Sequence, residues 1–186
     1  MSEADDGYLS VFATWLLRLN DDARALLGAL EAAELPDTSR RLLAGVLNYL
    51  FKSLDLIPDG VEDLGFLDDA FVFRVGARLA LPMAHEDEAA EPSAEVNDFG
   101  RLAAEADVVA SFLGDKYDRL EAHVLGLEQS SVRGRSVDQI LADEEALAQF
   151  GRELRAWSEG YVAPTFARDP KTLVKLRSFL TTKLGG

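Results

Sequence analysis

The sequence predicts an all-α protein, and two observations support that prediction. Apolar residues recur at every third or fourth position through most of the 186 residues, which is the period of an amphipathic helix. No stretch alternates apolar and polar residues between turn signals, as a strand would. We therefore expect a helical bundle that contains a helix–DLIPD turn–helix hairpin, followed by a second antiparallel helical hairpin and a C-terminal helix.

The first predicted domain, residues 1–81, holds four helices. Apolar spacing indicates a first helix over 8–19 and a second helix that Asn20–Asp22 caps. A third helix is expected over 40–53, and its wide apolar stripe predicts a central position in the bundle. A fourth helix is expected to end at Leu81.

A second predicted domain, residues 98–186, follows an acidic linker over 82–97 that we expect to be flexible. Its apolar residues form two heptad seams, one over 99–127 and one over 140–161. The loop between the seams is short, which predicts that the two helices fold back on each other within one chain.

The final predicted helix has an unusual balance of charge. Asp169 is expected to cap it, with Pro170 at its first position. From Arg168 onward the chain carries five basic residues and one acidic residue, whereas the whole chain has a net charge of −14. Leucines line one face of this helix, and the residues on another face are Lys171, Lys175, Ser178 and Thr182. We expect the helix to pack on the acidic body or to bind an acidic partner, and we favour packing on the body.

Composition narrows the function classes. The excess of acidic residues argues against nucleic-acid binding, which needs a basic face to neutralise phosphates. The chain has no cysteine, which excludes disulfides, thiolate metal sites and cysteine nucleophiles. With no recognisable secretory signal, this composition fits a cytoplasmic protein. The longest apolar-rich stretches are shorter than the roughly 20 residues that a membrane-spanning helix needs.

The most informative segment is Tyr49–Asp69, YLFKSLDLIPDGVEDLGFLDD, which places four aspartates around a proline turn between two apolar helices. These aspartates are Asp55, Asp59, Asp68 and Asp69. Pro58 ends the preceding helix because it disfavours helical dihedrals in the residue before it. Asp59 can cap a short segment after the proline, and Asp68 or Asp69 can cap the next helix. The aspartates therefore have structural roles available.

Residues 43–81 resemble the YkvA-like domain of unknown function, family number 1232. The residues that carry the resemblance are the Tyr49-Leu50 pair, the DLIPD turn over 55–59, Gly65 and the Asp68-Asp69 pair. Ser53 and Glu62 stand where the family usually has proline, which makes this turn less rigid. The resemblance implies a helical hairpin, often in membrane-associated proteins, and it implies no established activity or catalytic residue.

Two interpretations of the aspartates stay open from the sequence. In the first, Asp55, Asp59, Asp68 and Asp69 converge on Mg²⁺ or Ca²⁺, because these ions prefer carboxylate oxygens. In the second, the same side chains cap helices and pair with Arg74 or Arg78. We favour the second, because aspartate is common at helix caps and in turns.

The remaining residues point to no catalytic constellation. His85 and His123 have no partner at metal-ligand spacing, and we expect both at the surface. The leading hypothesis is a non-enzymatic interaction or scaffold module that binds a protein partner, as a monomer or a homodimer. One alternative is a metal-binding protein or metal-dependent enzyme built on the aspartate turn. The other is a peripheral membrane protein, which we do not favour because the few charges of the last helix bind a membrane surface weakly.

Overall fold

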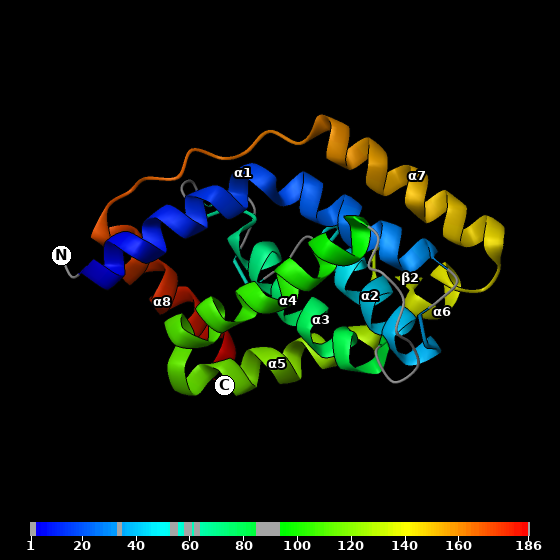
Figure 1. Cartoon of the computed structure of the whole chain (residues 1–186). Coiled ribbons are helices and arrows are strands. Elements are labelled where there is room, and N and C mark those ends of the chain that lie inside the picture. Colours follow the sequence, from blue (N-terminus) through cyan, green and yellow to red (C-terminus); the bar gives the residue numbers. More distant parts are fainter. Residues whose placement is uncertain are drawn as a thin grey trace.

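The computed structural model describes residues 3–32, 35–52, 56–57, 61, 64–84 and 94–185, without the side chains of 3–4, 82–84 and 94–97. This part of the chain is helical almost throughout, which confirms the all-α prediction (Figure 1). The α-helices are α1 (Glu3–Glu31), α2 (Asp37–Tyr49), α3 (Leu67–Ala84), α4 (Ala94–Leu113), α5 (Tyr117–Gly126), α6 (Val137–Ile140), α7 (Glu144–Gly160) and α8 (Pro170–Leu184). Short 3₁₀ turns, η1 (Gly114–Lys116) and η2 (Leu127–Gln129), flank α5.

Helix α3 lies in the middle of the bundle, where it packs against α1, α2, α4 and α5. Helix α7 packs along α1, and an extended segment, residues 161–169, then runs back beside α1 to the start of α8 (Figure 1). A single hydrophobic core includes buried side chains from Leu9 in α1 to Leu184 in α8. Both predicted domains therefore contribute to one core.

The prediction of two helices before residue 31 is wrong, because α1 is one helix of 29 residues. Asn20–Asp22 resembles a cap in the sequence, yet these residues lie inside the helix. Asp22 is fully buried and forms ion pairs with Arg74 and Arg101 from other helices. Pairing across the bundle replaces the capping role that the local sequence suggested.

The first heptad seam does not form one straight helix. It is divided at Gly114, whose φ of 54° lies in the left-handed region that glycine adopts readily, and the chain continues as η1 and α5. The second seam is divided as well, because the Asp143 side chain accepts a hydrogen bond from the Ala146 amide and caps α7. An acidic residue interrupts that seam because a helix begins there.

A two-stranded hairpin that the sequence did not predict holds the end of α2. Strands β1 (Ser131–Val132) and β2 (Arg135–Ser136) pair antiparallel. The Asn48 side-chain amide of α2 donates to the Arg135 carbonyl at 3.1 Å. The Arg135 guanidinium lies over the rings of Phe51 and Phe150, 5.1 and 4.8 Å from their centroids. The hairpin thus links α2 to α7.

Two glycines allow close packing against α2. A Cβ atom at Gly45 would lie 2.5 Å from the Leu127 carbonyl oxygen, and a Cβ atom at Gly76 of α3 would lie 2.5 Å from a Val46 methyl group. Neither position has space for a side chain. The absence of a Cβ therefore sets how closely η2 and α3 approach α2.

Helices α3 and α4 extend into the range predicted as a linker, since α3 ends at Ala84 and α4 begins at Ala94. The middle of that range, 85–93, lies outside the described residues. Among the helices that the structure describes, none combines the length and the apolar character needed to cross a bilayer.

Candidate functional site

The aspartate turn predicted as the site is described in part. Asp68 and Asp69 lie in the first turn of α3, and each side chain is about 1% exposed. Asp55 and Asp59 lie outside the described residues, as does Pro58. Leu56 and Ile57 of the turn are described, and both are buried in the core.

Asp68 joins the turn to both flanking helices. Its Oδ2 accepts hydrogen bonds from the Tyr49 hydroxyl at 2.8 Å and from the Ile57 amide at 3.0 Å. The same Tyr49 hydroxyl accepts a hydrogen bond from the Leu56 amide at 3.0 Å. We call this group of hydrogen bonds the Tyr49–Asp68 tie. It fixes the end of α2, two amides of the turn and the start of α3 at one buried point.

The electrostatics of the tie keep Tyr49 a donor. Burial, followed by the negative charges of Asp68 and Asp69, raises the pKa of the Tyr49 hydroxyl far above its ordinary value. Tyr49 therefore stays protonated at any physiological pH and donates to the carboxylate. Both carboxylates lie at the N-terminal end of α3, where the helix dipole favours negative charge.

The cation hypothesis remains a prediction. Within the described ranges, no three His, Cys, Asp or Glu side chains gather in the geometry of a metal site. The hypothesis, however, needs Asp55 and Asp59, which lie outside those ranges. What the structure adds is that one oxygen of Asp68 already accepts two hydrogen bonds from the protein.

His123 lies beside the tie, a contact that local sequence spacing does not signal. Its ring packs edge-on against the Tyr49 ring, with centroids 5.9 Å apart. The prediction that His123 lies at the surface is wrong. The residue as a whole is half-buried, and its Nε2 atom is buried. Burial, followed by the positive charge of Lys52, lowers the pKa of His123. The imidazole is therefore neutral at physiological pH.

A positive-φ residue lies between the turn and α3. Phe66 has a φ of 64°, which is rare for a side chain of this size. Its ring packs edge-on against Trp157 and Tyr161 at the end of α7, with centroids 6.2 and 5.6 Å away. The Tyr161 hydroxyl in turn donates to the Leu16 carbonyl of α1 at 2.8 Å. Aromatic packing thus holds the strained residue in place.

A buried ion network connects α3 to α1 and α4. The fully buried Arg74 guanidinium pairs with Asp22 at 3.0 Å and with Glu105 at 2.7 Å, and it stacks 3.9 Å from the Trp15 ring centroid. Arg101 pairs with the same two carboxylates. Desolvation lowers the pKa of Arg74, while both carboxylates act in the opposite direction and favour its charged form.

The arginines of α3 form ion pairs with acidic residues of α1 and α4. Arg74 and Arg78 were expected to pair with aspartates of the turn. The ion pairs that the structure describes for Arg74 are with Asp22 and Glu105, and Arg78 pairs with Asp107 of α4. Because these acids lie 29 to 52 residues away in sequence, local spacing could not identify them.

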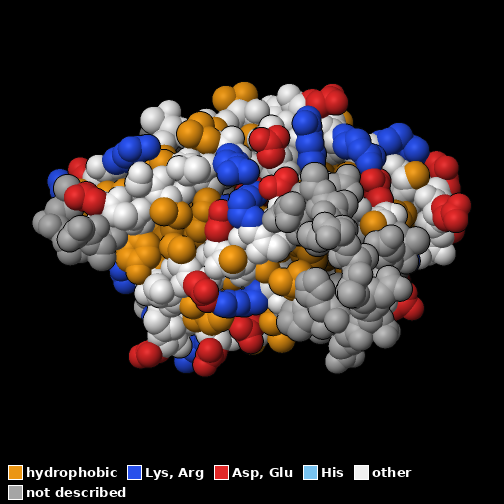
Figure 2. All heavy atoms as spheres, in the orientation of Figure 1, with side chains coloured by type: hydrophobic (Ala, Val, Ile, Leu, Met, Phe, Trp, Pro, Cys, Tyr) orange, Lys and Arg blue, Asp and Glu red, His pale blue; other side chains and the backbone are white. Residues whose placement is uncertain are grey.

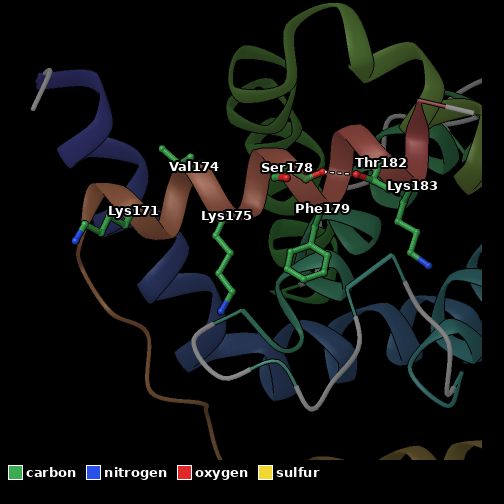
Figure 3. Close-up of a pocket in the computed structure, with 7 residues that line it drawn as sticks. All are labelled: Lys171, Val174, Lys175, Ser178, Phe179, Thr182 and Lys183. Atoms are coloured by element: carbon green, nitrogen blue, oxygen red, sulfur yellow. Dashed lines mark hydrogen bonds between the residues drawn. The ribbon is translucent and has the colours of Figure 1, made fainter.

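Helix α8 presents a second candidate site. The prediction that α8 packs on the body is confirmed, since Leu173, Leu176 and Leu180 are buried. Asp169 caps the helix through the Lys171 amide at 2.8 Å, as predicted. The opposite face borders a hollow of about 500 Å³ (Figure 3). Its described lining residues all belong to α8: Lys171, Val174, Lys175, Ser178, Phe179, Thr182 and Lys183.

The outer face of α8 is basic with apolar edges. Figure 3 shows Lys175, Phe179 and Lys183 pointing to one side of the helix and Val174 to the other. Val174 is 68% exposed. On the face of the molecule in Figure 2, acidic and basic side chains are interleaved, whereas α8 contains no acidic residue. Its outer face is therefore unlike the mixed surface seen there.

Comparison with known proteins supports the resemblance over a segment. Residues 39–74 match the model of a family described as "Protein of unknown function (DUF1232)". The match covers α2, the turn and the first part of α3, which are the elements joined by the Tyr49–Asp68 tie. No curated protein and no solved structure matches the chain.

Proposed function

We propose that this protein is a non-enzymatic interaction module of the cytoplasm, which binds a protein partner through the outer face of α8. One observation carries the proposal. The hollow on that face is lined by the exposed Val174 and the half-buried Phe179 together with Lys171, Lys175 and Lys183. Apolar side chains beside charged ones on an exposed face are a common feature of protein-binding sites.

The way α8 is held supports this proposal. Its leucine face is buried, and two side-chain contacts hold it from α4 and α5. The Arg177 guanidinium donates to the Phe112 carbonyl at 3.2 Å, and that of Arg119 donates to the Leu184 carbonyl at 2.7 Å. A helix fixed in this way presents its outer face in one orientation, which lowers the entropy lost on binding.

The Tyr49–Asp68 tie also supports the proposal, because it gives the described part of the turn a structural role. The described polar groups of the turn form a buried structural junction, which is the role of a scaffold. Accordingly we assign the buried hydrogen bonds of this segment to the stability of the bundle and assign partner binding to α8. The chain then resembles other small helical modules that present one helix face to a partner.

Photo-crosslinking in the source cell tests the proposal. A benzophenone amino acid is placed at Val174, and the matched control carries it at Val162, which is 83% exposed in the segment before α8. We expect a discrete protein adduct from position 174 and none of that mass from position 162. The adduct should disappear when Lys171→Glu is added. Equal labelling from both positions, or no adduct from either, would overturn the assignment.

A further inference from the structure

We infer that Phe66 is a strained latch, through which the end of α7 holds the start of α3 in the position that forms the Tyr49–Asp68 tie. This device lies apart from the outer face of α8 and does not depend on the function proposed above. The Phe66 ring packs on Trp157 and Tyr161, which lie outside the segment that matches the family. The latch therefore connects the matched segment to a part of the chain beyond it.

Phe66 occupies a backbone position that usually belongs to glycine or asparagine. The Leu67 amide donates to the Leu64 carbonyl at 3.1 Å and closes a four-residue turn in which Phe66 is the third residue. Its φ of 64° is typical of that position in turns that select glycine or asparagine, because a Cβ atom crowds the backbone there. The backbone alone therefore favours a change to negative φ, and a contact of the side chain has to oppose that change.

The end of α7 supplies this contact. The rings of Trp157 and Tyr161 pack on each other with centroids 5.1 Å apart, and the Phe66 ring meets both edge-on, which is a favourable geometry for aromatic pairs. The hydroxyls of Tyr161 and Ser158 each donate to a backbone carbonyl of α1, at 2.8 and 3.2 Å. Because α1 fixes the two aromatic residues, they form a firm support for the Phe66 ring.

The conformation of Phe66 determines where Asp68 lies. The Phe66 carbonyl accepts a hydrogen bond from the Ala70 amide at 3.1 Å, so the residue belongs to the first turn of α3. A change of φ at Phe66 would redirect the chain as it enters this turn and would move the Asp68 side chain. The Asp68 carboxylate would then lose the Tyr49 hydroxyl and the Ile57 amide. Release of the latch therefore opens the tie.

The surroundings of the latch allow it to open without unfolding the bundle. Phe66, Trp157 and Tyr161 are half-buried, unlike the fully buried aromatic residues of the core. The extended segment begins at Tyr161, and no backbone–backbone hydrogen bond joins its residues 162–168 to another described residue (Figure 1). Val162, next to Tyr161, is 83% exposed. A molecule that binds this edge in only one of the two states would shift the equilibrium between them, and the tie would respond.

Amide hydrogen exchange of the full chain, measured residue by residue by NMR, tests the latch. The Leu56 and Ile57 amides report on the tie, and the Val72 and Phe73 amides in α3 report on the opening of the core. Phe66→Ala removes the ring and keeps the Cβ, whereas Phe66→Gly removes both. Relative to the core amides, we expect exchange at the tie to be about fivefold faster or more in Phe66→Ala and within about twofold of the original chain in Phe66→Gly.

A change on α7 tests the other half of the latch. Trp157→Ala removes the support and leaves the strain, so exchange at the tie should accelerate as it does in Phe66→Ala. In a chain that already carries Phe66→Gly, the same change should have no effect. Arg155→Ala is the control, because Arg155 lies at the same end of α7 and pairs with Glu31 instead of the aromatic residues. Circular dichroism confirms that each variant is folded.

The opposite results would overturn the latch. Equal acceleration in Phe66→Ala and Phe66→Gly would show an ordinary packing contact without strain. Unchanged exchange at Leu56 and Ile57 in Trp157→Ala, or the same acceleration in Arg155→Ala, would show that the end of α7 does not hold the tie through Phe66. Acceleration of equal size at the core amides would show general destabilisation.

Discussion

Replacement of Tyr49 by Phe tests the Tyr49–Asp68 tie with the loss of one oxygen atom. The ring stays and keeps its contact with His123, so packing changes little. The Leu56 amide loses its acceptor, and Asp68 loses one of the two donors described for Oδ2. A buried group left without a partner costs about 1–3 kcal/mol, and more where a charge is involved. We therefore expect a loss of about 2–4 kcal/mol in the free energy of unfolding.

Urea unfolding followed by circular dichroism measures this loss. The midpoint should fall while the dependence of free energy on urea stays unchanged, because the surface exposed on unfolding is the same. Tyr8→Phe is the control, since Tyr8 packs against Phe12 and Phe112 and its hydroxyl has no hydrogen bond within the described part of the chain. A loss below about 0.5 kcal/mol for Tyr49→Phe, or an equal loss in both variants, would refute the reasoning.

Three further predictions concern packing, protonation and metal binding. Gly45→Ala should destabilise the protein by about 1–3 kcal/mol, because the new Cβ would meet the Leu127 carbonyl. Gly100→Ala is the control: its Cβ would enter open space, and the change should stabilise the helix by about 0.5–1 kcal/mol. Thermal melts of the two variants measure the difference. His123 has a lowered pKa when folded, so the unfolded chain binds more protons as pH falls through its ordinary value near 6.5. Stability from this group is complete above that pH and is lost below it, and His123→Gln should flatten the decline between pH 7.5 and 5 in urea titrations. If the aspartates cap helices, millimolar Mg²⁺ or Ca²⁺ should not raise the melting temperature; a saturable rise that Asp59→Asn abolishes would favour the cation site.

Features set by neighbouring residues could be predicted from the sequence. The Asp169–Pro170 start of α8 and the burial of α2, which the apolar stripe over 40–53 predicts, both depend on signals within a few residues. The DLIPD segment could be identified for the same reason. The sequence placed the turn between two helices, although it could not show that Tyr49 and Asp68 meet there, since 19 residues separate them.

Features set by distant contacts could not be predicted. Asp22 follows an Asn-Asp pair that commonly caps helices, and only the folded chain brings Arg74 to it from 52 residues away. His123 approaches Tyr49 through the packing of α5 on α2, which leaves no trace in local spacing. The break at Gly114 is different. A glycine after an apolar run is a signal for a helix end, and it was outweighed by the continued heptad spacing beyond it.

The burial of the matched segment limits what the family resemblance can say about function. Every residue from 42 to 50 and from 67 to 74 is buried, and these positions make up most of the described part of 39–74. Side chains in such positions contribute to stability, and a substitution there changes folding before it changes binding. The outer face of α8 lies outside the match, and its residues are exposed apart from the half-buried Phe179. Under the function proposed above, a variant that alters partner binding while leaving the free energy of unfolding unchanged is therefore expected on α8.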